Sequence, residues 1–230
     1  MDETQVTREP GGAGVGPRYG ILGGTFDPPH LGHLVLAQEA LIRLALDRVW
    51  FVPTGAPPHK PNRRVSSHAD RRAMVERAIA GDARFAMSAI ELERDGPSYS
   101  VDTLRQLRRE WGENVVMCFI MGWDMLTYLP QWRQPEQVIA TLDRIAATRR
   151  PGYAADPDEI RQLERLLPGL AEKLTILAAP QVEVSSTEIR TRVASGMPIR
   201  YLVSESVRSY IEERGLYRSD NPSESGGAGL

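Results

Sequence analysis

Two histidines are the side chains best suited to chemistry, and they lie in the segment Gly23–His33, which reads GGTFDPPHLGH. His30 and His33 are three residues apart, so at the start of a helix they face the same side. A helix start offers free N–H groups and the positive end of the helix dipole, and imidazoles there can donate to phosphate oxygens. The pattern favours a phosphate site. Taken alone, it also fits a polar helix cap, or a zinc site for which no further ligand appears at suitable spacing.

A second candidate anion site is the segment Val184–Arg190, VSSTEIR. Its hydroxyl side chains can cap a helix, and Glu188 follows Ser185 by three residues, as in a capping box. Arg190 comes one turn later and can bind phosphate through its planar guanidinium. An ordinary capped helix with a surface arginine is the simpler alternative. Two such sites, each expected after a strand of one sheet, fit a nucleoside triphosphate better than two unrelated caps.

Alternating apolar and periodic segments must position these residues. The run Val115–Ile120 is the strongest strand candidate, because six apolar residues in a row fit a strand buried on both faces. Further strands are expected at Tyr19–Leu22, Val49–Val52, Arg84–Met87, Arg144–Ala147 and Leu174–Leu177, and helices at Leu31–Leu46, Ala69–Ile79, Val101–Trp111, Thr187–Ala194 and Glu205–Arg214. This alternation predicts a single α/β domain with a Rossmann-like, doubly wound parallel sheet and helices on both faces. Ligands of such sheets bind at the carboxyl ends of the strands.

Length and composition agree with one globular domain. The chain has 230 residues, 41% hydrophobic and 25% charged, with a net charge of -2, so no basic excess indicates a nucleic-acid partner. No stretch reaches the ~18 apolar residues of a transmembrane helix, and the N-terminus lacks a signal-peptide core. Cys118 lies in an apolar run, and we expect a buried, inert thiol. A cytoplasmic protein without a membrane partner is the expectation.

The two ends and one internal segment fall outside this pattern. Residues 1–18 and 218–230 are expected to be disordered, which leaves 19–217 as the domain. The glycines of Gly11–Gly16 resemble a dinucleotide fingerprint, but no strand can precede them, so that interpretation is rejected. Residues 151–169 contain three prolines and match no catalytic motif. We expect a surface excursion there, which leaves homo-oligomerisation open.

Several motifs together resemble one known family. Gly-x-Phe26-x-Pro28 followed by His30-x-Gly32-His33, with a late Ser-Ser-Thr-x-Ile-Arg, resembles the nucleotidyltransferase α/β-phosphodiesterase superfamily. Within it, the chain resembles the bacterial nicotinate-nucleotide adenylyltransferases. Four more stretches carry that resemblance: Pro57–Lys60, Pro97–Leu104, Met121–Leu126 and Leu129–Trp132. The resemblance runs from about Tyr19 to Tyr217.

The resemblance implies transfer of AMP from ATP to nicotinate mononucleotide (NaMN), giving nicotinate adenine dinucleotide and pyrophosphate. The NaMN phosphate would attack the α-phosphorus in line, without a covalent intermediate, and Mg²⁺ would be held mainly by substrate phosphates and water. His30, His33 and Arg190 would be the catalytic residues. The implied ATP-binding residues are Gly23, Gly24, Thr25, Phe26, Gly32, Gly122, Asp124, Ser186 and Thr187, although Asp124 could simply cap a helix.

The implied NaMN site depends on an aromatic ring and a proline-stiffened loop. Trp132 would stack on the pyridine ring, with a core tryptophan as the alternative. Lys60 would meet a phosphate, while His59 could equally be a loop-packing residue. The remaining implied residues are Ser100, Thr103 and Arg133, with only the backbone of Arg133 expected to contribute.

Two other functions compete with this one. Another enzyme of the superfamily, such as a phosphopantetheine adenylyltransferase or a cytidylyltransferase, would share the first motif but not the Pro57–Lys60 and Trp132 elements. A nucleotide-binding regulator without turnover would differ in kind, but it would be expected to lack one of the histidines or Arg190. A Rossmann oxidoreductase is disfavoured because Gly23–His33 lacks the third glycine of the fingerprint.

Overall fold

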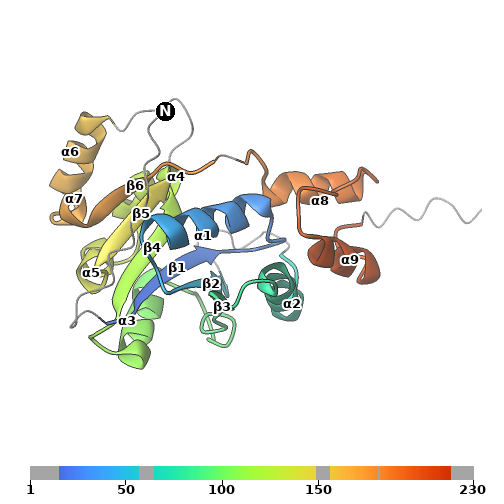
Figure 1. The fold of residues 1–230 in the computed structure, drawn as a ribbon, viewed down its shortest axis with the longest axis horizontal. Helices are drawn as coiled ribbons and strands as arrows, with labels where there is room; N and C mark the ends of the chain where they lie inside the picture. Colours follow the sequence, from blue (N-terminus) through green and yellow to red (C-terminus); the bar gives the residue numbers. More distant parts are fainter. Residues whose placement is uncertain (1–15, 57–64, 149–155, 181, 219–230) are drawn as a thin grey trace, which may run out of the picture.

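The core of the protein is a parallel sheet. The computed structural model describes residues 16–56, 65–148, 156–180 and 182–218. Within them lie six strands: β1 (Arg18–Gly24), β2 (Arg48–Pro53), β3 (Phe85–Met87), β4 (Val116–Gly122), β5 (Arg144–Thr148) and β6 (Leu174–Leu177). All neighbouring strands pair in parallel, in the order β3-β2-β1-β4-β5-β6 (Figure 1). This order is that of a Rossmann-type sheet, with its switch point between β1 and β4, and the predicted fold class is confirmed.

Helices cover the sheet, and the last two helices of the chain lie beyond it on one side (Figure 1). They are α1 (Leu31–Arg43), α2 (His68–Ile79), α3 (Ser100–Trp111), α4 (Trp123–Tyr128), the 3₁₀ turn η1 (Leu129–Gln131), α5 (Pro135–Thr141), α6 (Pro157–Leu166), α7 (Leu170–Lys173), α8 (Ser186–Ala194) and α9 (Glu205–Glu213). The helices predicted with bounds correspond to α1, α2, α3, α8 and α9. A helix after the Val115–Ile120 strand and a short helical pattern within 151–169 were expected without bounds and correspond to α4 and α6, whereas α5, α7 and η1 were not predicted.

Strand β4 shows how the two faces are built. Met117 and Phe119 belong to one hydrophobic cluster, and Cys118 and Ile120 belong to another. Side chains alternate across a strand, so a continuous apolar run supplies both cores. Helices α3 and α5 contribute to the first cluster, and α1 and α2 contribute to the second.

A third, smaller cluster joins the C-terminal helices to α2. Met74 of α2 packs with Ile189 of α8 and with Val207 and Ile211 of α9. In Figure 1, α8 and α9 lie beyond the carboxyl end of β1, beside α2. The late Ser-Ser-Thr motif is thereby brought close to the Gly23–His33 segment.

Two segments differ from the simple pattern. Helix α1 ends at Arg43 instead of continuing to Leu46, and Ala45 adopts a left-handed φ of 48°. In the stretch 151–169, residues 151–155 lie outside the described residues, and α6 follows them. Leu163 and Leu167 of this stretch are buried in the first hydrophobic cluster. Apolar periodicity within α6 thus places part of the expected excursion against the core.

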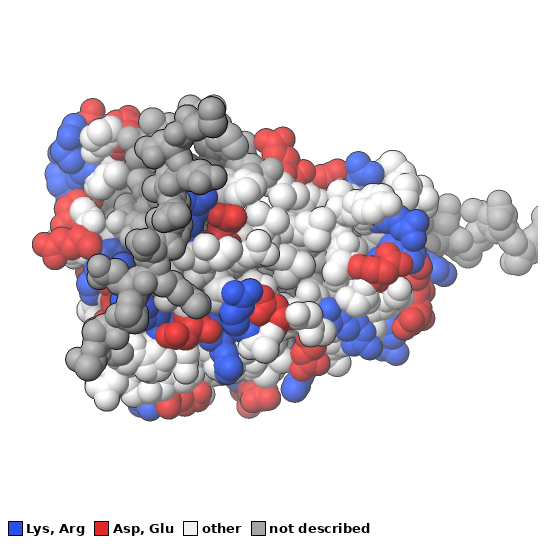
Figure 2. All heavy atoms as spheres, viewed as in Figure 1, with Lys and Arg blue, Asp and Glu red and all other residues white. Residues whose placement is uncertain are grey.

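The surface carries no field of a single sign on the face drawn in Figure 2, where acidic and basic side chains are interspersed. Among the described residues, no helix is both long and apolar enough to span a membrane.

Candidate active site

A cavity of about 400 Å³ opens at the carboxyl edge of the sheet, at the switch point. Residues of β1, of β4 and of the loops that follow them form its walls, as expected for a doubly wound sheet. Eight of the predicted site residues line it: Gly23, Gly24, Thr25, His33, Ser100, Thr103, Gly122 and Trp132. The structure therefore brings together residues that are up to about a hundred positions apart.

His30 and His33 form a stacked pair at the start of α1. Their ring centroids are 3.7 Å apart with an interplanar angle of 28°. The backbone N–H of His30 donates to Nδ1 of His33 (3.2 Å), so the hydrogen of a neutral His33 ring is on Nε2. Nδ1 of His30 is buried and has no hydrogen-bond partner among the described residues. His33 is thus oriented by the backbone and lines the cavity, while the neighbouring His30 ring has a nitrogen that could still form a hydrogen bond.

Both imidazoles are held in the neutral form. Burial lowers the pKa of His30 to about 4. Burial and the neighbouring His30 also lower the pKa of His33 well below its ordinary value. Near neutral pH each ring therefore has one N–H donor and no charge.

The loop between β1 and α1 is shaped by Phe26 and Asp27. Phe26 is 1% exposed, has a left-handed φ of 49° and contacts His33 edge-on, with 4.9 Å between ring centroids. Asp27 is also 1% exposed, and its carboxylate accepts from Tyr217 Oη (2.6 Å) and from the Ser66 N–H (3.3 Å). A buried carboxylate needs such donors. Desolvation and Asp27 together raise the pKa of Tyr217 far above its ordinary value.

The late motif caps α8 as predicted and contacts the same loop. Ser185 is the N-cap residue, and its Oγ accepts from the Glu188 N–H (3.1 Å). Ser186 Oγ donates to the carbonyl of Pro28 (2.8 Å). Arg190 Nη1 donates to the carbonyl of Asp27 (2.7 Å), and Nη2 donates to Thr187 Oγ1 (3.2 Å).

Arg190 faces a neighbouring hollow rather than the main cavity. This hollow has a volume of about 510 Å³, and Asp27, Ser66, Tyr217 and Arg218 also line it. Ser186, Thr187, His30, Phe26 and Gly32 do not line the 400 Å³ cavity. A Cβ on Gly32 would lie 3.1 Å from His30 Nδ1, so this glycine accommodates the histidine ring.

One wall of the cavity is polar. Glu91, Ser98 and Thr103 line it, and each is under 9% exposed. Thr103 Oγ1 donates to Glu91 Oε1 (2.7 Å), whereas Ser98 Oγ is buried without a partner. Burial raises the pKa of Glu91, and the Thr103 hydrogen bond opposes that shift. Ser98 is a second buried group whose hydrogen-bonding capacity is unused in the protein alone.

Another part of the cavity lining is aromatic. Trp132 is partly buried and meets Phe119 edge-on, with 5.9 Å between ring centroids. The guanidinium of Arg133 lies 4.5 Å from the centroid of the Tyr99 ring and does not line the cavity. Gly122 is the N-cap residue of α4 and has open space where a Cβ would be, while Asp124 is exposed in the first turn of that helix.

Two predicted residues and one cysteine complete the comparison with the sequence. Lys60 and His59 lie outside the described residues. Cys118 is fully buried in β4, as predicted, and burial raises the pKa of its thiol to about 12, as expected for an unreactive cysteine.

Sequence reasoning missed Arg71, Glu91, Ser98 and Tyr217 around this site. Asp27 lies inside the first motif, so its burial could have been suspected. Tyr217 is 190 positions from Asp27, and no pattern in the sequence links the two.

Comparison with known proteins agrees with this fold. The cytidylyltransferase-like family model matches residues 21–192. The structure of a Plasmodium falciparum nicotinic acid mononucleotide adenylyltransferase complexed with NaAD has a TM-score of 0.68 at 18% identity, covering 87% of this chain and 97% of that one. The same protein complexed with APC gives a TM-score of 0.66 over the same shares of the two chains. Fold and site together define a nucleotidyltransferase of the cytidylyltransferase-like class.

Curated sequences narrow the class. A "Probable nicotinate-nucleotide adenylyltransferase" of Dehalococcoides mccartyi is 43% identical, covering 88% of this chain and 98% of that protein. A protein of the same name from Desulfitobacterium hafniense is 46% identical, covering 87% and 96%. The chain belongs to the nicotinate-nucleotide adenylyltransferase family.

Proposed function

We propose that the protein transfers AMP from ATP to nicotinate mononucleotide, releasing pyrophosphate and forming nicotinate adenine dinucleotide. The observation that carries the proposal is the 43–46% identity, over nearly the whole length, to proteins named for this activity. The stacked histidines at the carboxyl edge support it, because they offer neutral donors where a triphosphate would lie.

The reaction is an in-line displacement at phosphorus. The NaMN phosphate oxygen forms a bond to the α-phosphorus as the bond to the bridging oxygen breaks, and pyrophosphate leaves with that electron pair. The enzyme contributes orientation and stabilisation of the negative charge that spreads over the phosphoryl oxygens. No covalent intermediate is required, and the single cysteine is buried with a raised pKa.

His33 is the residue nearest the reacting phosphate in this proposal. Its orientation by the His30 N–H leaves the Nε2 hydrogen free to donate to an α-phosphate oxygen. His30 offers its unpartnered Nδ1 beside that ring. Arg190, Ser186 and Thr187 would hold the β- and γ-phosphates, with the hollow beside Arg190 as room for the leaving group.

NaMN would lie between the polar and aromatic walls. Trp132 would stack on the flat pyridine ring. Ser100 is the first residue of α3, and the free N–H groups of that helix start suit the nicotinate carboxylate. Thr103 would support this wall through Glu91. Gly122 and Asp124 would meet the adenosine sugar, and Lys60 would meet a phosphate.

A divalent cation, proposed as Mg²⁺, would enter with ATP and neutralise part of its charge. The donor chemistry of the site fits a phosphate-held cation. His33 offers an N–H toward the cavity, and the Asp27 carboxylate is occupied by Tyr217 and Ser66. Substrate phosphates and water would therefore supply the oxygen ligands that Mg²⁺ prefers. The reducing cytoplasm, where ATP is abundant, is the proposed location.

The test is pyrophosphate release with ATP and Mg²⁺, comparing nicotinate mononucleotide with nicotinamide mononucleotide. We expect rapid release with the acid and slow release with the amide. Release with neither nucleotide, but with phosphopantetheine or in a CTP-dependent reaction, would replace this proposal with another activity of the same class. Tight ATP binding without any turnover would favour a regulator.

A further inference from the structure

Arg71 is the largest fully buried side chain of the described residues, and none of the motifs contains it. It lies on α2 and is 1% exposed. Its guanidinium donates to four backbone carbonyls, those of Thr54 (2.6 Å), Thr25 (3.1 Å), Ser66 (3.2 Å) and Gly55 (3.3 Å). One side chain thus connects the loop after β1, the loop after β2 and the residues just before α2.

The chemistry of this contact requires an arginine. Buried carbonyls need donors, and loop carbonyls beyond the strand ends have no ladder partner. A guanidinium presents five N–H donors in one plane, whereas a lysine ammonium offers three from a single atom. The positive charge is balanced electrostatically by the carboxylates of Asp27 and Glu91, which counteract the lowering of the Arg71 pKa by burial.

Two of the four residues fixed in this way line the cavity. Thr25 and Thr54 line it together with His33. Gly55 is packed so tightly that a Cβ would lie 2.1 Å from the Glu91 carbonyl oxygen and 2.6 Å from Ser98 Oγ. A shift of this loop would therefore disturb both the floor of the cavity and its polar wall.

We propose that Arg71 is a positioning residue for AMP transfer, which fixes Thr25 and Thr54 beside His33 by binding the carbonyls of both loops. The inference rests on the proposed function. It assigns Arg71 no contact with substrate, because the side chain is 1% exposed, does not line the cavity and directs four N–H groups to carbonyls. Misplacing cavity walls by about 1 Å can cost ~100-fold in rate.

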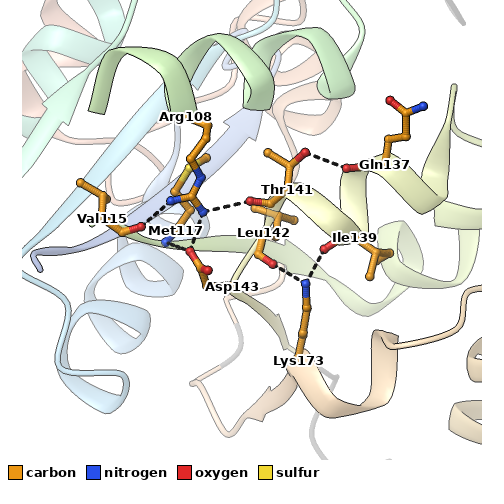
Figure 3. Close-up of polar contacts among 9 residues, drawn as sticks. All are labelled: Arg108, Val115, Met117, Gln137, Ile139, Thr141, Leu142, Asp143 and Lys173. Atoms are coloured by element: carbon orange, nitrogen blue, oxygen red, sulfur yellow. Dashed lines mark hydrogen bonds and ion pairs between the residues drawn. The ribbon is translucent and has the colours of Figure 1, made fainter. Parts of the chain in front are cut away.

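A partly buried arginine that also binds backbone carbonyls supplies the control. Arg108 of α3 donates to the carbonyls of Val115 (2.6 Å) and Thr141 (3.0 Å) and pairs with Asp143 (2.6 Å) (Figure 3). It does not line the cavity at the carboxyl edge of the sheet. An arginine that only stabilises the fold should behave like Arg108 when it is replaced.

The experiment compares Arg71→Lys, Arg71→Gln and Arg108→Lys by steady-state kinetics and by thermal unfolding. We expect kcat to fall at least tenfold in Arg71→Lys and further in Arg71→Gln, with each KM within about threefold of wild type. Arg108→Lys should lower the melting temperature and leave kcat within twofold. The graded loss at nearly constant KM is the signature that a purely stabilising role would not produce.

The inference is overturned if folded Arg71→Lys and Arg71→Gln retain kcat within twofold. It is also overturned if neither variant folds while Arg108→Lys does, because Arg71 would then be a folding residue. An inactive wild-type protein would instead reject the proposed function, so the two failures are distinguishable.

Discussion

Polar groups at the two edges of the sheet differ in how far they are hydrogen-bonded to one another. At the amino edge, the groups drawn in Figure 3 bond one another. Asp143 accepts from Arg108 and from the Met117 N–H (2.8 Å), and Lys173 donates to the carbonyls of Ile139 (2.8 Å) and Leu142 (2.7 Å). These contacts join α3, α5, α7 and the starts of β4 and β5.

The carboxyl edge leaves polar atoms unused. His30 Nδ1 and Ser98 Oγ are both buried without a partner, and two imidazoles are held far below their ordinary pKa. Leaving a buried polar atom unpaired costs about 1–3 kcal/mol. Such a cost is compensated when a ligand supplies the missing partner. Among the described residues Trp50 Nε1 of β2 is also buried without a partner and does not line the cavity, so an unpaired atom alone does not mark a site. The carboxyl edge differs in combining such atoms with a cavity, which Ser98 lines.

The largest expected effect comes from breaking the carboxyl edge at His33. We expect His33→Ala to lower kcat/KM by about 10²–10³-fold, the typical loss when one oriented donor is removed from a developing charge. Pyrophosphate release measures it. His68→Ala is the control, since His68 is exposed and, among the described residues, its ring bonds the Leu92 carbonyl, and it should stay within twofold. Equal losses of kcat/KM in the two variants would contradict a catalytic role for His33.

Acid should lower the free energy of unfolding through His30, which lies at the same edge of the sheet. Since the pKa of His30 is about 4 in the folded state and 6.5 ordinarily, the unfolded chain binds more protons between these values. This group's contribution therefore declines as pH falls from 6.5 to 4, by about 3 kcal/mol, and is constant below that range. Urea unfolding across this range should show a smaller decline for His30→Gln than for wild type. Parallel curves would contradict the assigned shift.

Replacing Arg108 tests the other half of the comparison. Arg108→Met removes the guanidinium donor from two carbonyls and one of the two donors to Asp143, and we expect a loss of about 2–3 kcal/mol in the free energy of unfolding. The kcat/KM of the folded fraction should stay within twofold. A large loss of kcat/KM at unchanged stability would mean that the amino edge also serves catalysis.

The smallest effect is expected at the aromatic wall. Trp132→Ala should raise the KM for nicotinate mononucleotide about tenfold, because a stacked ring contributes about 1–1.5 kcal/mol. The KM for ATP should change little. Trp111→Phe is the control, because Trp111 packs on Tyr19 and does not line the cavity. An unchanged KM for nicotinate mononucleotide in Trp132→Ala would place the pyridine ring elsewhere.

Much of the fold could be predicted because its signals are local. The six-residue apolar run of β4, the cap at Ser185 and the period-3.6 pattern of α3 each depend on neighbours in the sequence. The contacts that close the site are not local. Arg71 reaches Thr25 over 46 positions, and Tyr217 reaches Asp27 over 190.

The site was predicted in part for the same reason. His33 and Trp132 lie in motifs, and the parallel sheet brings both to one cavity. The sequence could not show that Arg190 lies outside the main cavity. Its position depends on side-chain hydrogen bonds from α8 to the carbonyls of Asp27 and Pro28 in the first loop. The roles of His59 and Lys60 stay predictions.

Identifying the product by mass spectrometry tests most directly whether the carboxyl edge joins the two substrates. With ATP, Mg²⁺ and nicotinate mononucleotide, we expect one nicotinate adenine dinucleotide and one pyrophosphate per turnover from wild type and from Arg108→Met. His33→Ala should form the dinucleotide at least 100-fold more slowly. A wild-type protein that forms no dinucleotide, or a His33→Ala variant that forms it equally fast, would contradict the assignment.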